Sequence, residues 1–291
     1  MVWVFIQSLI SGILAGGVYA LFGVGITIIF GVMKMVDFSA CSQLVWGMYF
    51  TWIFYSVTGL NCYYAIPFVI VCMGALAYLI FKVIVRPLLG SDDTSFILVT
   101  LGLSYFLQNF AEFVFGPDPK TVPSSIKTSS IVLGDYTIGL PRFIAFCMMV
   151  VLVLAVYLLL NRTTLGRAMR ATAEKPEVAQ MLGINTKKTF TIAFIIGVVF
   201  AGVSGLLITP IYYVTPTAGS LFRTTAYIAV IIGSLGDIKG ALVGGITIGV
   251  IEALVTGMIS NDLGPVGVCV ALLLVLYLRP QGFFGKGERK A

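Results

Sequence analysis

WVFIQSLISGILAGGVYALFGVGITIIFGV, residues 3–32, decides the fold of this chain because it contains no charged residue. A helix needs about 20 mostly apolar residues to cross a bilayer, so this stretch is more than long enough. Seven further apolar stretches follow, at residues 43–57, 63–85, 96–115, 143–160, 190–211, 226–259 and 266–278. The pattern predicts an all-α polytopic membrane protein, a single transmembrane domain over residues 1–291. We expect about eight membrane-spanning helices, and up to about ten if long glycine-rich stretches are broken or re-entrant.

The composition of the 291 residues agrees with a membrane protein and argues against other classes. Hydrophobic residues make up 59% of the chain and charged residues 10%, whereas a soluble domain carries roughly 25% charged residues. The chain has no histidine, and its five cysteines are scattered without a CxxC pair. Without imidazoles, paired thiols or clustered carboxylates, the sequence offers no candidate catalytic residue and no metal site. We therefore do not expect an enzyme.

Two long loops differ in charge, which predicts the side of the membrane that each one faces. Residues 161–189 carry six basic residues against two acidic ones, whereas residues 116–141 carry no net charge. The positive-inside rule predicts a cytoplasmic loop at 161–189, an extracytoplasmic loop at 116–141 and a cytoplasmic C-terminus. The simplest way to make the number of crossings agree is that residues 226–259 are interrupted near 234–240 and contribute two passes or a re-entrant hairpin.

The basic loop contains a predicted short helix that begins at Pro176 and is closed by Gly183. Its apolar face is formed by Val178, Met181 and Leu182, which have helical spacing. Such a face, flanked by basic residues, suits docking into a groove on a partner protein. It suits binding to anionic lipid equally well, and the residues alone favour neither interpretation.

Glycines recur at helical spacing in the first and seventh apolar stretches. Gly12 and Gly16 are four residues apart, and Gly236, Gly240 and Gly244 repeat the same interval. This spacing lets helix backbones approach closely, which is the interpretation that we favour. The alternative is unwound backbone that exposes polar groups to a passing solute.

Four stretches together resemble one protein family: residues 20–34, 166–171 (GRAMRA), 240–252 and 278–286 (LRPQGFFGK). They are similar to the membrane subunit of ATP-driven branched-chain amino acid importers, in the hydrophobic amino acid uptake family of ABC permeases. The resemblance covers essentially the whole chain. It implies transport of leucine, isoleucine, valine or related amino acids across a prokaryotic cytoplasmic (inner) membrane.

The resemblance also implies partners and a docking segment. The partners would be ABC ATPase subunits, a second homologous permease or a second copy of this chain, and an extracytoplasmic solute-binding protein, with no nucleic acid. ATP would be used by the ATPase subunits, and this chain lacks a GxxxxGK[ST] phosphate loop, so we expect no cofactor in it. The residues expected to couple to the ATPase are Gly166, Arg167, Ala168, Arg170, Ala171, Glu174, Glu177, Ala179 and Gly183.

By the same resemblance, the residues expected at the substrate path are Asp37, Phe38, Ser39 and Glu252. The family usually reads Asn-Phe-Ala-His-Gly where residues 37–41 read DFSAC, so Phe38 is the clearest match. The Asp37 carboxylate could face the amino group of a substrate, or pair with Lys34 one turn earlier. The Glu252 carboxyl could line the path or bond to the backbone of a neighbouring helix.

The altered residues 37–41 leave the substrate open. An importer of the same class could carry urea, an amide or a different amino acid. An ion-coupled secondary transporter is a further alternative, but it would require a relay of ionisable residues within the membrane, and this chain offers few.

Overall fold

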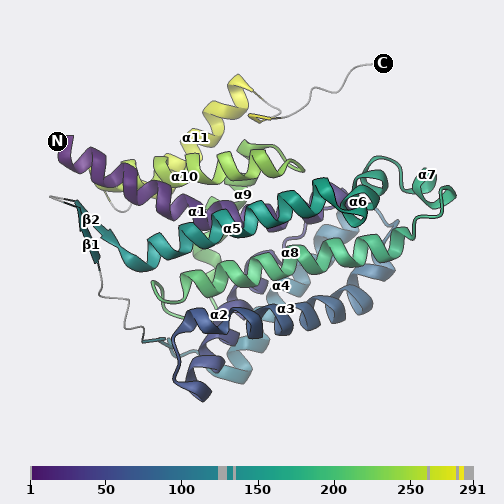
Figure 1. Cartoon of the computed structure of the whole chain (residues 1–291), viewed down its shortest axis with the longest axis horizontal. Helices are drawn as coiled ribbons and strands as arrows, with labels where there is room; N and C mark the ends of the chain where they lie inside the picture. The colour runs from purple at the N-terminus through teal and green to yellow at the C-terminus, as the bar shows by residue number, and fades with distance from the viewer. Residues whose placement is uncertain (1, 124–129, 134–135, 261–262, 280–281, 285–291) are drawn as a thin grey trace.

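The computed structural model describes residues 2–123, 130–133, 136–260, 263–279 and 282–284 as a helical bundle with one β-hairpin (Figure 1). The long helices are α1 (Val2–Met33), α2 (Ala40–Thr58), α3 (Ile66–Ile80), α4 (Asp93–Phe115), α5 (Leu140–Arg162), α8 (Thr186–Ile208), α9 (Ala218–Gly233), α10 (Ile238–Met258) and α11 (Gly264–Leu278). The connecting elements are the 3-10 helices η1 (Cys62–Ala65) and η3 (Arg86–Leu88), the π-helical turn η2 (Phe81–Val85), α6 (Thr164–Glu174), α7 (Pro176–Met181), and the paired strands β1 (Ser130–Leu133) and β2 (Tyr136–Gly139). The predicted all-α architecture is confirmed, and the hairpin is an addition to it.

The number of membrane-spanning helices agrees with the prediction of about eight. In the described part of the chain, six helical segments are long and apolar enough to cross a membrane, and α9 and α11 are shorter apolar helices. The 19-residue helix α2 is less apolar, because it carries the buried polar residues Ser42, Gln43 and Thr51. Helix α2 therefore belongs to the interior of the bundle.

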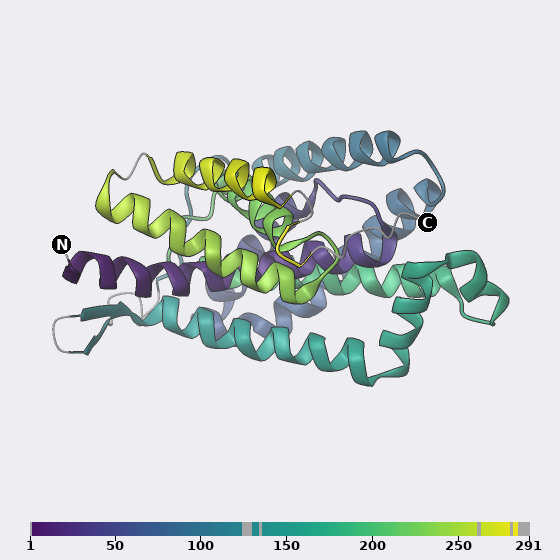
Figure 2. The ribbon, with the colours of Figure 1, turned by 90° about the horizontal axis from the view of Figure 1, so that it is seen from above.

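The connecting elements gather at opposite ends of the bundle, which we call the hairpin end and the α7 end (Figures 1 and 2). The β-hairpin and the start of α1 lie at the hairpin end, and α6 and α7 lie at the other. At the hairpin end, Lys120 and Val214 exchange two backbone hydrogen bonds of 2.9 Å. This pair joins the loop after α4 to the loop after α8.

Helices α1 and α10 pack antiparallel through their glycines. A Cβ placed on Gly16 would lie 2.8 Å from the Gly245 carbonyl oxygen, and one on Gly249 would lie 2.3 Å from the Gly16 Cα. A Cβ on Gly12 would lie 2.7 Å from the Val250 Cα. Helix α1 continues unbroken to Met33. The glycine spacing in these two helices therefore serves close backbone contact, as predicted.

The seventh apolar stretch, residues 226–259, is interrupted at the position that the charge distribution of the loops predicted. Helix α9 ends at Gly233 and α10 begins at Ile238, with Ser234 and Gly236 at positive φ (92° and 95°) in the turn between them. A Cβ on Gly233 would lie 2.1 Å from the Gly240 carbonyl oxygen, so only glycine permits these helices to meet at the turn. The expected break near residues 234–240 is confirmed.

The described part of the tail, residues 282–284, returns to this turn. The Phe283 N–H donates to the Ile232 carbonyl oxygen at 2.9 Å, which satisfies one carbonyl at the C-terminal end of α9. The Phe283 side chain packs against a cluster that includes Ile232 and Val268. The family-like tail is therefore attached to α9.

Candidate functional site

The connection between α1 and α2 holds Asp37 in a hydrogen-bonded turn. Its Oδ1 accepts from the backbone N–H of Ser39 at 2.8 Å and from the Ser39 hydroxyl at 2.6 Å. Its Oδ2 accepts from Nε2 of Gln43 at 3.0 Å. An aspartate that bonds the N–H two residues later is a common turn former, so α2 begins directly after it. The Asp37 carboxylate is buried, with 1% of its residue surface exposed, and is held by uncharged donors.

Lys34, the other partner considered for Asp37, does not pair with it. Lys34 follows the last turn of α1 at a φ of 59°, and its backbone N–H donates to the Phe30 carbonyl oxygen at 2.7 Å. The Lys34 side chain is exposed, and in the described ranges no ion pair joins it to Asp37. The positive φ turns the chain away from the helix, which separates the two residues that a continued helix would have stacked.

Phe38 packs against α9 and α4. Its ring lies 5.4 Å from that of Tyr227, centroid to centroid, and both side chains are half-buried. The Tyr227 hydroxyl donates to the Asp37 carbonyl oxygen at 2.7 Å, and the Phe38 N–H donates to Oγ1 of Thr100 at 3.4 Å. Three of the four predicted path residues, Asp37 to Ser39, are thus brought together where α2, α4 and α9 meet.

An arginine that the sequence analysis missed lies in the same region. Nη2 of Arg223, on α9, lies 3.4 Å from Oγ of Ser104 on α4. The hydroxyls of Ser104 and Ser42 are 2.8 Å apart, and the Cys41 thiol interacts with the Arg223 guanidinium. We call these residues, with Asp37 to Ser39, Gln43, Thr100 and Tyr227, the polar seam.

A signal for Arg223 was present in the sequence. The hydropathy pattern places the start of the seventh apolar stretch at residue 226, which leaves Arg223 in the preceding loop. The structure begins α9 at Ala218, which places Arg223 in the second turn of an apolar helix. A basic residue three positions before an uninterrupted apolar run is the pattern that could have identified it.

The fourth predicted path residue, Glu252, lies apart from the polar seam. On α10 its carboxyl interacts with the Tyr19 side chain of α1, and its Cγ would lie 3.6 Å from a Cβ on Gly264 of α11. Asp37 instead contacts α2 and α9. The four predicted path residues therefore belong to two clusters.

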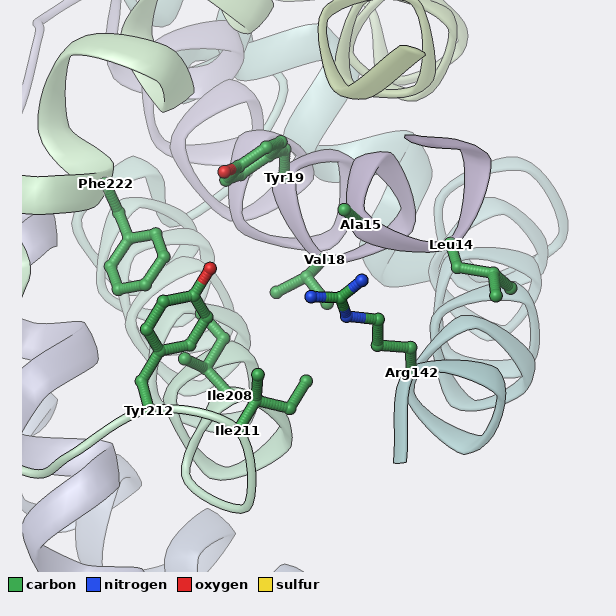
Figure 3. A pocket seen from close by; sticks show the side chains of 9 residues that line it. All are labelled: Leu14, Ala15, Val18, Tyr19, Arg142, Ile208, Ile211, Tyr212 and Phe222. Carbon is green, nitrogen blue, oxygen red and sulfur yellow. The ribbon is translucent and has the colours of Figure 1, made fainter. Parts of the chain in front are cut away.

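Tyr19 also lines a recess among α1, α5 and the loop after α8 (Figure 3). In Figure 3 Arg142 reaches from α5 toward Val18, and Tyr212 and Phe222 lie across the recess. The rings of Tyr212 and Phe222 meet edge to face at 5.1 Å. Most of the lining is aliphatic or aromatic, and Arg142 is the one charged side chain among the residues that line the recess.

The predicted coupling segment forms a tight helical corner after α5. The Thr163 side chain accepts from the Gly166 N–H at 3.1 Å and caps α6. A Cβ on Gly166 would lie 2.1 Å from the Leu160 carbonyl oxygen, so the corner requires glycine there. The Arg170 guanidinium donates to that same carbonyl oxygen. Arg170 therefore holds α6 against the end of α5.

Helix α7 begins at Pro176 and is followed by Gly183 at a φ of 83°, as predicted. Its apolar residues face outward: Met181 is 86% exposed, Leu182 76% and Val178 47%. Of the residues expected to couple to an ATPase, the exposed ones are Arg167, Arg170, Glu174, Glu177 and Gly183, the half-buried ones are Ala168 and Ala171, and the buried ones are Gly166 and Ala179. The buried members shape the segment, and the exposed ones form its surface.

Comparisons with known proteins agree on one family. The family model described as branched-chain amino acid transport system / permease component matches residues 8–278. The high-affinity branched-chain amino acid transport system permease protein BraD of Pseudomonas aeruginosa is 28% identical over 298 residues, which cover 98% of this chain and 97% of BraD. LivH of Escherichia coli, a permease protein of the same description, is 29% identical over 304 residues, covering 98% and 96%. A probable LivH of Methanocaldococcus jannaschii is 27% identical over 297 residues, covering 96% and 92%.

Proposed function

The chain belongs to the family of branched-chain amino acid transport permeases, and we propose that it supplies half of the pathway of an ATP-driven importer. The transported solute is leucine, isoleucine, valine or a related amino acid. A second permease, either a homologue or another copy of this chain, supplies the other half. ABC ATPase subunits and an extracytoplasmic solute-binding protein drive the pathway between its two open states, so that ATP is hydrolysed outside this chain.

The observation that carries this proposal is the exposed apolar surface of α7. Val178, Met181 and Leu182 are exposed, with 47%, 86% and 76% of their surface accessible, and α7 lies at the far end of the bundle from the β-hairpin (Figure 1). Glu174 and Glu177 lie beside them, and Arg167 is exposed on α6. An apolar helix face with a charged rim is typical of a protein–protein contact.

The docking role fixes the orientation in the membrane. An ATPase that uses cellular ATP lies in the cytoplasm, so the α7 end of the bundle is cytoplasmic. The loop at 161–189, the α9–α10 turn and the tail at 282–284 then face the cytoplasm. The start of α1, the loop at 116–141 and the Lys120–Val214 pair face outward. The excess of basic residues at 161–189 supports this orientation, and the membrane is the cytoplasmic (inner) membrane of a prokaryote.

Docking can be tested by placing charges on α7. The double substitution Met181→Asp with Leu182→Asp removes the apolar contact while leaving the transmembrane helices untouched. We expect the ATPase subunits to be lost from the purified complex, and uptake to fall by at least about tenfold. Val57→Asp is the matched control, because Val57 is 80% exposed at the C-terminal end of α2. A double variant that retains its ATPase and its uptake would contradict the docking role.

The solute can be tested in a host that lacks this gene, with the chain restored together with its partners. Uptake of labelled leucine, valine, a small polar amino acid and urea is compared while ATP or the proton gradient is depleted in turn. ATP-dependent leucine uptake that requires the chain supports the proposal in full. Uptake that follows the proton gradient and ignores ATP would contradict it and favour a secondary transporter.

A second substrate class has one observation in its favour. Residues 37–41 differ from the usual family pattern, and the structure places Asp37 to Ser39 in the polar seam with Arg223 nearby. If this seam borders the path, its altered chemistry could suit a different amino acid, or urea or an amide. ATP-dependent uptake of such a solute in the same experiment would support this second candidate.

A further inference from the structure

Arg223 lies at the middle of the bundle, where a charge is least expected. Its guanidinium contacts Ser104, which is 11 residues from each end of α4 (Asp93–Phe115). With a rise of about 1.5 Å per residue, Ser104 lies about 16 Å from either end of the helix. The hydrocarbon core of a bilayer is about 30 Å thick, so the guanidinium lies near its mid-plane.

The charge of Arg223 is poorly compensated within the chain. Its Nε is buried without a hydrogen-bond partner, and the guanidinium contacts two uncharged groups, Oγ of Ser104 at 3.4 Å and the Cys41 thiol. No ion pair joins it to a carboxylate in the ranges that the structure describes. The carboxylate of the seam, Asp37, already accepts from Ser39 and Gln43. A guanidinium has five N–H donors, and in a membrane such a charge is usually tied to a function.

Arg223 also belongs to a polar stripe along one face of α9. Ser220, Arg223, Thr224 and Tyr227 have the spacing of one helical face. Ser220 and Thr224 are exposed, and Arg223 and Tyr227 are half-buried. A polar face on an intramembrane helix is suited to a water-filled or solute-filled space rather than to lipid. Arg223 is therefore partly exposed on the polar face of α9.

We propose that Arg223 binds the carboxylate of the transported solute at mid-membrane, with the Ser104 hydroxyl orienting the guanidinium. This assignment rests on the proposed function and names the solute as a carboxylic acid, such as an α-amino acid. Two parallel N–H···O bonds from an arginine to a carboxylate combine charge with geometry, which a lysine does not reproduce. In this assignment Asp37 does not contact the solute. It is a positioning residue, because its carboxylate accepts hydrogen bonds from Ser39 and Gln43 and holds their side chains in place.

The test uses the complete importer in proteoliposomes, with the solute-binding protein added. Three quantities are measured: ATPase subunits recovered per permease, ATP hydrolysis stimulated by the loaded binding protein, and labelled leucine uptake per ATP hydrolysed. For Arg223→Gln we expect uptake per ATP to fall at least about tenfold, with assembly and stimulated hydrolysis within about twofold of the unmodified importer. Arg223→Lys keeps the charge and should lose only a few-fold. Arg86→Gln, which removes an exposed arginine in η3, should leave all three quantities within about twofold.

Three results would overturn the assignment. Unchanged uptake by Arg223→Gln would show that the guanidinium does not bind the solute. A parallel loss of assembly, hydrolysis and uptake in both Arg223→Gln and Arg223→Lys would show that the arginine only supports the fold. The outcome is separable from the proposed function: ATP-dependent uptake of urea but of no carboxylic acid would keep the importer and refute the carboxylate site.

Discussion

Replacing Gly245 by alanine tests whether the α1–α10 contact is as close as the structure indicates. An ideal Cβ on Gly245 would lie 2.4 Å from the Ala20 nitrogen and 2.5 Å from the Ala20 Cα. Ordinary van der Waals contact begins near 3.4 Å, so the two helices would have to separate by about 1 Å. The obstructing atoms belong to backbone and cannot rotate away. The same separation would loosen the neighbouring Gly16–Gly249 contact.

The expected loss of stability follows from two opposing effects. Forcing an extra carbon into a packed contact costs about 1–3 kcal/mol. Replacing glycine by alanine within a helix stabilises by about 0.5–1 kcal/mol. The net change for Gly245→Ala is a loss of about 0–2.5 kcal/mol in the free energy of unfolding. Gly74→Ala in α3 is the matched control, because no heavy atom lies within 4 Å of its Cβ position, and it should gain about 0.5–1 kcal/mol.

Both variants would be purified in the same detergent and unfolded by a denaturant titration followed by far-UV circular dichroism. The comparison between them matters more than either absolute value, since detergent affects both alike. If Gly245→Ala proves as stable as Gly74→Ala, the backbones of α1 and α10 do not touch at this point, and the packing interpretation of the glycine spacing is wrong.

The remaining predictions concern the polar seam and the α5–α6 corner. Asp37→Asn should change the free energy of unfolding by less than about 1 kcal/mol, because the Gln43 amide can turn its unpartnered Oε1 toward the new amide group. Asp37→Leu removes the acceptor of the Ser39 N–H and hydroxyl, while Gln43 Nε2 keeps its bond to the Ser39 hydroxyl oxygen, so this variant should lose about 1–3 kcal/mol. Equal stability of the two variants would refute the seam. Arg170→Gln should lower the free energy of unfolding by about 1 kcal/mol, because it releases the Leu160 carbonyl oxygen. Arg167→Gln, on the exposed side of α6, should change the free energy of unfolding by less than about 0.5 kcal/mol. A larger effect of Arg167→Gln in the same titration would contradict the role of Arg170 at the α5–α6 corner.

The helical bundle and its interruption could be predicted because both follow from hydropathy and charge along the chain. Apolar runs long enough to span a bilayer are a strong signal, and the basic residues at 161–189 forced an extra crossing near residues 234–240. The start of α7 at Pro176 and its closure before Gly183 depend only on local backbone preferences. Such features need no knowledge of which helices meet.

The polar seam could not be assembled from the sequence because its residues come from three helices. The interval between Asp37 and Lys34 suggested an ion pair, but the backbone leaves the helix at Lys34, so the carboxylate meets Ser39 and Gln43 instead. The contact between Arg223 and Ser104 joins positions 119 residues apart, and nothing local encodes it. The hairpin within residues 116–141 was missed although the sequence carries a signal for it, because residues 130–139 read SIVLGDYTIG, two strand-favouring runs separated by Gly-Asp.

The bond between Phe283 and Ile232 has a consequence for biosynthesis. Synthesis proceeds from the N-terminus, so the Ile232 carbonyl receives this donor only after almost the whole chain has been made. Gly282 fits beside it at a φ of 76°, with its Cβ position 2.9 Å from the carbonyl oxygens of Ile231 and Ile232. A chain that stops before Gly282 would lack the donor for the Ile232 carbonyl oxygen at the end of α9. The contact at the end of α9, the helix that carries Arg223, is therefore made only when translation is nearly complete.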